Sequence, residues 1–237
     1  LTFAQSLGNV GEAAIPYLCD AMKNNSNVII RRASAKTLNL IGSEKALPNL
    51  IEAFKTDPDP VVQGSSAGAM ATIGVPAIED LLKILTEPEC TAFQVGLINL
   101  ALSFIGSKAP GALDNATQSE NIEIRIAAIT VLAEQIQSGQ HQSATNALIK
   151  ALSDQSSEVR AEAATMAGKT LEPEDAYEKL CELLCDESTQ VRKNASLALM
   201  KMEAKDATKP LRNAEAEEKN DQVKSVMKVA INVLENI

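Results

Sequence analysis

The stretch Ile29–Gly42, IIRRASAKTLNLIG, decides the fold. It begins with apolar residues and an arginine, continues with small residues, and places Leu38 seven positions after Arg31. The same arrangement returns along the chain every 30 to 35 residues, and we call the residue at the place of Arg31 the anchor of its repeat. A motif that recurs at such a period predicts a solenoid, in which stacked repeats share one continuous core. The anchors are Arg31, Gln63, Val95, Arg125, Arg160, Arg192 and Lys224.

Each repeat contains a first helix, a polar turn and a second helix that carries the anchor. The segments AIPYLCDAM (14–22) and ALPNLIEAF (46–54) have the apolar stripe of a first helix, and KTDPDP (55–60) is a typical turn. No segment has the period-two alternation of a strand. We therefore expect an all-α fold, an α-solenoid (α-α superhelix) of about seven short HEAT-like helix pairs. Glycines that we expect to cap helices close several repeats: Gly8, Gly42, Gly74 and Gly106.

The domain organisation follows from the extent of the repeats. They cover the whole chain, so we expect a single HEAT-like repeat domain over residues 1–237. Residues 1–8 are expected to be the end of a preceding helix, and residues 204–237 a capping repeat with a polar outer face. The connection 138–141 departs most from the regular spacing and is the expected place for a bend.

Composition narrows the classes of function. Hydrophobic residues make up 45% of the chain but aromatic residues only 3%, which favours helices packed on helices. The formal net charge of -9 argues against nucleic-acid binding, which needs clustered cations. No apolar run reaches the ~18 residues of a membrane span, so we expect no membrane insertion. The four cysteines form no CxxC pair, which indicates a reducing compartment.

Residues that could carry out catalysis are few in this sequence. The single histidine, His141, lies in a polar connection, and we interpret it as a solvated loop residue. No cluster has the spacing of a metal site, so we expect no metal, and we assign no catalytic residue. We interpret the acidic stretch 215–221 as a solvated turn. We expect four anchors to be structural, in a ladder with turn acids such as Asp154 and Asp186: Arg31, Arg125, Arg160 and Arg192.

The positions one and five residues after each anchor are unusual in the first three repeats. These two positions share the exposed face of the second helix. A glycine inside a helix costs about 1 kcal/mol relative to alanine, so glycines there need an explanation. Two explanations stay open: close packing between helices, or a shallow floor for a flat ligand. The pairs in the first three repeats are Arg32/Lys36, Gly64/Gly68 and Gly96/Leu100.

Five segments carry a likeness to a known family: SLGNVGEAAIPYLCDAM (6–22), IIRRASAKTLNLIG (29–42), ALPNLIEAF (46–54), VVQGSSAGAMATIG (61–74) and LALSFIGSKA (100–109). They resemble the phycobilisome-lyase HEAT-like repeat family of cyanobacteria and plastids. Within it, the likeness is greatest to the phycobilisome-degradation proteins of the non-bleaching B type, with the E/F-type phycobilin lyases as wider kin. The likeness runs through residues 1–203, although 96–99 (GLIN) departs from the Gly-His run that is usual in the degradation proteins.

The resemblance implies a protein that handles bilins, the open-chain tetrapyrroles of phycobiliproteins. Such a protein attaches, isomerises or detaches phycocyanobilin or phycoerythrobilin at cysteines of phycobiliprotein subunits, with lyase-type (carbon–sulfur lyase) activity and no tightly bound cofactor. It implies phycobiliprotein subunits and a second HEAT-repeat lyase subunit as partners, and a place in the cyanobacterial cytosol or the plastid stroma. The alternative is a non-enzymatic adaptor that binds a protein on its concave face.

For a bilin we expect a groove on the second helices of the first three repeats. A bilin is flat and apolar and carries two propionates, which Arg32 and Lys36 could bind. Gly64, Gly68 and Gly96 would let such a ligand approach the helix backbone. Further candidates are Asn39, Ser65, Asn99 and Ser103 for the polar ring groups, with Tyr17 and Phe93 for stacking.

Overall fold

The computed structural model describes residues 10–109, 111–137, 139 and 142–237. In this part of the chain thirteen α-helices alternate with turns and short 3-10 helices, and there is no strand. The predicted all-α solenoid is therefore confirmed. Contacts divide the chain into two compact units, residues 1–112 (unit 1) and 113–237 (unit 2).

The structure does not test some of the sequence predictions. The helix end expected at residues 1–8 lies outside the described residues, as does His141. The single-domain organisation and the capping role of residues 204–237 stay predictions.

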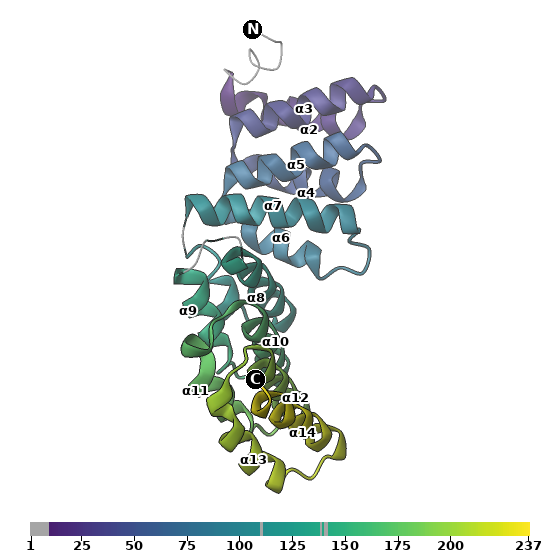
Figure 1. Cartoon of the computed structure of the whole chain (residues 1–237). Coiled ribbons are helices and arrows are strands. Elements are labelled where there is room, and N and C mark those ends of the chain that lie inside the picture. The colour runs from purple at the N-terminus through teal and green to yellow at the C-terminus, as the bar shows by residue number, and fades with distance from the viewer. Residues whose placement is uncertain (1–9, 110, 138, 140–141) are drawn as a thin grey trace. The chain divides into compact units, whose positions relative to one another are not determined.

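Unit 1 contains three helix pairs (Figure 1). Its second helices lie side by side, because α5 packs against both α3 and α7. Pro16 and Pro48 stand in the first turn of α2 and α4, where proline is tolerated. The pairs are α2 (Ile15–Asn24) with α3 (Val28–Ile41), α4 (Leu47–Thr56) with α5 (Pro60–Ile73), and α6 (Ile78–Leu85) with α7 (Ala92–Lys108).

Unit 2 contains three further pairs and one second helix, α8 (Ile122–Gln137), without a full partner. A short 3-10 helix, η4 (Ala116–Gln118), stands where the fourth repeat should have its first helix. The sequence 109–121 explains this, because it contains polar and turn residues around a single leucine, Leu113, instead of an apolar stripe. The pairs are α9 (Gln142–Ala151) with α10 (Ser157–Thr170), α11 (Pro173–Leu183) with α12 (Thr189–Lys201), and α13 (Thr208–Glu217) with α14 (Asp221–Glu235).

The second helices pack through small residues. The buried positions of α10 hold one valine, four alanines and a glycine, and the side chains of Val159, Ala163, Ala164 and Ala167 are not accessible to solvent. Gly168 shows how close the contact is, because a Cβ on it would stand 2.6 Å from Cα of Ala198 in α12. Only some of the predicted glycine caps stand at helix ends. Gly42 ends α3 with a φ of 62°, the left-handed conformation that glycine adopts freely, whereas Gly106 lies inside α7 and is not the predicted cap.

The four anchor arginines form a ladder of ion pairs. Each of its four guanidinium groups donates through Nε and Nη2 to both oxygens of a carboxylate in the next repeat. In each of the four arginines, Nη1 donates to two backbone carbonyls of the turn that precedes its own helix. For Arg160 the distances are 2.7 and 2.9 Å to Asp186, and 2.9 and 3.1 Å to the carbonyls of Asp154 and Gln155. The pairs are Arg31–Asp57, Arg125–Asp154, Arg160–Asp186 and Arg192–Glu218.

The last pair corrects the interpretation of the acidic stretch 215–221. Glu218 is not a solvated residue, since its side chain is 2% exposed and accepts both bonds from Arg192. Its carboxylate also accepts hydrogen bonds from the backbone N–H groups of Lys219 and Asn220. Glu218 lies in the turn of the last repeat and pairs with Arg192, the anchor of the preceding repeat, in the same way as Asp186 pairs with Arg160.

A first prediction concerns the strength of the ladder. Arg160→Ala should lower the free energy of unfolding by about 3 kcal/mol, because Asp186 would stay buried without its partner. Chemical denaturation followed by circular dichroism measures the change. The matched control is Arg212→Ala, which breaks an exposed pair with Glu235 in the same unit and should cost less than about 1 kcal/mol. Equal losses would contradict a structural ladder.

A second prediction concerns pH. The Arg192 guanidinium lowers the pKa of Glu218 to about 2, below the ordinary value of about 4.3 for a glutamate in an unfolded chain. The stabilisation that this carboxylate provides is therefore present above pH ~4.3 and is lost as the pH falls through about 2. Glu218→Gln should be less stable than wild type at pH 6, and the difference should shrink towards pH 2. Denaturant titrations between pH 2.5 and 6 test this, and a difference that does not vary with pH would refute it.

Candidate functional site

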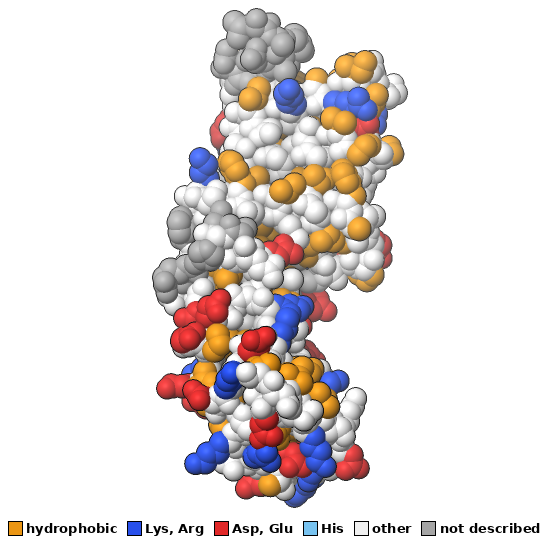
Figure 2. Space-filling model, in the orientation of Figure 1, with side chains coloured by type: hydrophobic (Ala, Val, Ile, Leu, Met, Phe, Trp, Pro, Cys, Tyr) orange, Lys and Arg blue, Asp and Glu red, His pale blue; other side chains and the backbone are white. Residues whose placement is uncertain are grey.

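A groove of about 370 Å³ lies on the solvent-facing side of α3, α5 and α7. Helix α5 supplies its floor, α7 supplies an apolar wall, and α3 supplies Asn39. Figure 2 shows hydrophobic side chains gathered in the part of the view where Figure 1 places these helices. The lining residues are Asn39, Gly64, Ala67, Gly68, Ala71, Thr72, Leu97, Leu100, Ala101 and Phe104.

The glycines of the floor are not explained by helix packing. A Cβ on Gly64 would meet only the tip of Leu97, at 3.9 Å, and a Cβ on Gly96 would meet nothing within 4 Å. Gly68 is tighter, because its Cβ would stand 3.1 Å from Nδ2 of Asn39, a side-chain end. Gly168 in unit 2 shows what a packing glycine looks like, since there the clash is with backbone. Close packing therefore does not account for Gly64 and Gly96, and the floor explanation is favoured for Gly64, which lines the groove.

Asn39 gives the groove a polar edge. Its Oδ1 accepts a hydrogen bond of 2.6 Å from Oγ1 of Thr72, which fixes the amide between α3 and α5. Its Nδ2 lies over Gly68. The opposite wall is apolar and well exposed, with Leu100 at 69% and Phe104 at 47%. The two sides of the groove thus differ in chemistry, and a ligand with one polar and one apolar edge would be held in one orientation.

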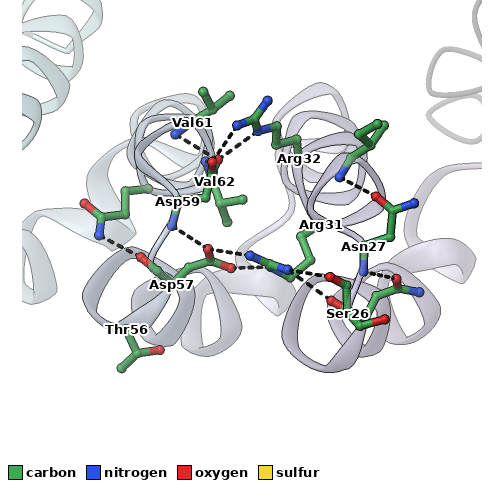
Figure 3. Close-up of polar contacts among 12 residues, drawn as sticks. Ser26, Asn27, Arg31, Arg32, Thr56, Asp57, Asp59, Val61 and Val62 are labelled. Carbon is green, nitrogen blue, oxygen red and sulfur yellow. Dashed lines mark hydrogen bonds and ion pairs between the residues drawn. The ribbon is translucent and has the colours of Figure 1, made fainter.

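Arg32 is paired in this structure (Figure 3). Its Nε and Nη2 donate to the carboxylate of Asp59 at 2.9 and 2.5 Å. Asp59 also accepts from the backbone N–H groups of Val61 and Val62, both at 3.1 Å, and so caps α5. The hydrogen bond from Arg32 is the main reason why the pKa of Asp59 is lowered to about 2. The structure therefore corrects the expectation that Arg32 offers a free guanidinium fork to a propionate, since Asp59 already occupies that fork.

Lys36 as a ligand for a propionate stays a prediction. It lies one turn after Arg32 on α3, is exposed, and forms no ion pair or hydrogen bond with the described residues. A second cation, Lys108 on α7, lies with its Nζ 5.6 Å from the ring centroid of Phe104, which lines the groove.

The other predicted residues do not line the groove. Tyr17 is 79% exposed but lies on α2, a first helix. Asn99 stands four residues after its anchor, which is a core position in other repeats. Ser103 occupies on α7 the place that Asn39 has on α3, but it does not line the groove. The lining of the groove also does not include Ser65, Gly96 or Phe93.

Sequence reasoning missed Leu97 and Phe104. Both belong, with Leu100, to a stripe at helical spacing on α7. The signal was present, because α7 is apolar around most of its circumference, and a helix of this kind must bury its second face against something.

The cysteines provide no activated nucleophile among the groups whose pKa is shifted. Burial raises the pKa of the Cys19, Cys90 and Cys181 thiols, so these are protonated at neutral pH. In the described part of the chain no three His, Cys, Asp or Glu residues are grouped so that they could hold a metal. None of the described helices combines the length and the hydropathy needed to cross a membrane.

Two smaller hollows belong to the repeat itself. One, of about 290 Å³, includes Arg31 and Asp57, and the other, of about 240 Å³, includes Arg192 and Glu218. Both lie at ladder pairs in equivalent places of their repeats, so they follow from the stacking and carry no separate function.

Comparison with known proteins identifies the family. The model of the HEAT repeats matches residues 1–71, 109–184 and 145–232. The bilin biosynthesis protein MpeU of Synechococcus sp. (strain WH8020) is 62% identical over 234 residues, which are 99% of this chain and 79% of that protein. The chain belongs to the HEAT-repeat family of MpeU. The resemblance to bilin-related HEAT-repeat proteins is thereby confirmed.

Two solved structures align with this chain at low identity. Human deoxyhypusine hydroxylase in complex with glycerol is 20% identical, with a TM-score of 0.45 over 99% of this chain and 89% of that one. The complex of CpcE and CpcF of phycocyanin lyase from Nostoc sp. PCC7120 is 18% identical, with a TM-score of 0.38 over 98% of this chain and 87% of that one.

A third prediction separates the two kinds of glycine. Gly64→Ala and Gly96→Ala should each raise the stability by about 1 kcal/mol, because both sites have room for a Cβ and alanine favours the helix. Gly168→Ala should lower it, because its Cβ would overlap the backbone of α12. Thermal melts of the three variants test this, and a loss of stability in Gly64→Ala would restore the packing explanation.

Proposed function

We propose that this protein binds a bilin in the groove on α3, α5 and α7 and presents it to phycobiliprotein subunits as a lyase-type factor. The observation that carries the proposal is the floor of α5, where Gly64 and Gly68 expose helix backbone beneath an apolar wall. At Gly64, packing gives no reason for the missing side chain. The relationship to a bilin biosynthesis protein supports the choice of ligand.

The chemistry of the groove fits a bilin edge by edge. The apolar ring edges match Leu97, Leu100 and Phe104 on α7. A lactam carbonyl can accept a hydrogen bond from Nδ2 of Asn39, which is the donor left after Oδ1 has accepted from Thr72. A propionate can reach the ammonium of Lys36. Because Arg32 is held by Asp59, we assign one propionate to this chain instead of two.

The reaction needs little from this protein beyond orientation. In attachment, the S–H group of an acceptor cysteine adds across a carbon–carbon double bond of the bilin, so a C–S bond forms and the proton moves to carbon. No oxidant is consumed, and detachment is the reverse. The nucleophile belongs to the acceptor, in keeping with the protonated thiols of Cys19, Cys90 and Cys181. Holding the bilin in a reactive geometry is then the catalytic contribution.

The finer assignments belong to the same proposal. The ligand is phycocyanobilin or phycoerythrobilin, carried as a substrate. Attachment is favoured over detachment because the relative is named for biosynthesis. A second HEAT-repeat subunit is a further partner, and the place of action is the cyanobacterial cytosol or the plastid stroma.

The decisive experiment fills the groove at a site that tolerates a side chain. Gly64→Leu should weaken phycocyanobilin binding at least tenfold without lowering the melting temperature, because its Cβ has room but its outer carbons occupy the floor. The visible absorption of phycocyanobilin, titrated with protein, measures binding. The matched control is Gly96→Leu, on the same face but outside the groove, which should bind like wild type.

A second arm of the experiment tests the cation. Lys36→Glu should weaken binding of biliverdin about tenfold, the scale of one charge-assisted contact, and leave binding of its dimethyl ester unchanged. Lys193→Glu, on α12 in unit 2, is the control and should leave both unchanged. Wild-type binding in Gly64→Leu, or equal losses in Gly96→Leu, would refute the groove. If wild type does not alter the spectrum of phycocyanobilin at all, the proposal fails and the adaptor function takes its place.

A further inference from the structure

A row of exposed apolar side chains runs across the beginnings of the three second helices of unit 1. Ile29, Val61 and Phe93 each stand two residues before the anchor, and they are 68%, 49% and 51% exposed. We call these three residues the apolar row. The repeat itself does not require them, because in unit 2 the same position holds polar residues: Glu123, Glu158, Gln190 and Gln222.

The apolar row borders the groove. A position two before the anchor lies three residues, nearly one helical turn, from the position one after it, so Val61 neighbours Gly64 on the same face of α5. Ile30, which is 42% exposed, adds apolar surface at the start of α3. The row and the groove thus form one continuous surface on α3, α5 and α7.

The spacing of the apolar row matches that of an α-helix. Packed helices lie about 8–10 Å apart, so neighbouring members of the row are separated by about that distance. Seven residues of an α-helix advance about 10.5 Å. A helix lying across α3, α5 and α7 would therefore place apolar side chains at every seventh position onto Ile29, Val61 and Phe93 in turn.

The charges beside the row indicate the rest of the partner. Helices α3, α5 and α7 contain no aspartate or glutamate. The two carboxylates in the turn before α5, Asp57 and Asp59, are held by Arg31 and Arg32. Arg32 is still 43% exposed, and Lys36 follows it one turn later. A partner with carboxylates beside its apolar stripe is favoured here, and one with cations is disfavoured.

We propose that the apolar row is the docking site for an amphipathic, acid-flanked helix of the protein that receives the bilin. This inference rests on the proposed function, because an acceptor thiol can reach a ligand in the groove only if the acceptor lies over the same face. The row is placed for this, one turn from Gly64, and its contact leaves the groove itself free for the ligand.

The test removes the apolar row while keeping the groove. The triple variant Ile29→Gln, Val61→Gln, Phe93→Gln should lose at least thirtyfold in affinity for the acceptor, while the absorption change with phycocyanobilin stays as in wild type. Glutamine is a good helix former, so the helices should persist. The probes are the purified apo-α and apo-β subunits of phycocyanin and of phycoerythrin, measured by calorimetry.

The control removes three exposed apolar side chains elsewhere. The triple variant Leu197→Gln, Val229→Gln, Val233→Gln changes exposed residues of α12 and α14 and should bind the acceptor like wild type. A comparison of two charged variants tests the sign of the charge on the partner. Val61→Glu should bind an acid-flanked helix at least fivefold more weakly than Val61→Lys, although both lose the same apolar side chain.

Each outcome decides between the possibilities. Unchanged acceptor binding in the row variant, or equal loss in the control, overturns the docking site, as does wild type that binds none of the four subunits. A row variant that loses self-association instead shows that a second copy covers the row, and this also overturns the proposal. An intact bilin spectrum in any of these cases leaves the groove standing, whereas a wild type without any bilin response refutes the proposed function itself.

Discussion

In four repeats the stacking is fixed by the bidentate pairing between an anchor arginine and a carboxylate of the following repeat. One guanidinium joins its own turn, through two carbonyls, to the next turn, through two carboxylate oxygens. The second and third repeats have no anchor arginine, since their anchors are Gln63 and Val95. Gln63 keeps the bond to its own turn, at 2.8 Å from the carbonyl of Asp57, but an amide forms no ion pair. These are the two repeats whose second helices carry the floor and the apolar wall of the groove.

Other contacts hold the repeats together where the ladder is weak. The amide of Gln94 is buried and donates to the carbonyl of Phe54, which joins the start of α7 to α4. Arg32 and Asp59 tie α3 to the cap of α5. Stability at the groove is thus supplied from the helix beginnings, and the middle of α5 is left free to keep glycines that cost about 1 kcal/mol each. An arrangement of this kind is expected where a surface is kept for binding.

The sequence was sufficient for the repeats and for the ladder, because both depend on local pattern and on one position that recurs. The sequence was not sufficient to predict contacts between side chains of neighbouring repeats. The pair Arg32–Asp59 joins residues 27 apart, and only the packing of α3 beside α5 shows that the arginine is occupied. Glu218 looked solvated because its partner, Arg192, lies 26 residues away. Asn39, Gly64 and Gly68 were found because they share the exposed face, whereas Phe104 was missed because apolar residues were assigned to the core.

The distribution of charge gives a reason why binding should be concentrated on unit 1. Residues 1–112 contain eight Lys and Arg against ten Asp and Glu, whereas residues 113–237 contain 14 against 21. Within unit 1 the second helices contain four cations and no acid, so the carboxylates of that unit lie on its first helices and turns. A ligand with carboxylates, or a partner helix flanked by them, therefore meets less repulsion on α3, α5 and α7 than on the unit 2 surface, where acids are more numerous. The face that has glycines at positions 64 and 68 also has no aspartate or glutamate on its helices. A bilin and an acidic helix both need an open surface and the absence of negative charge.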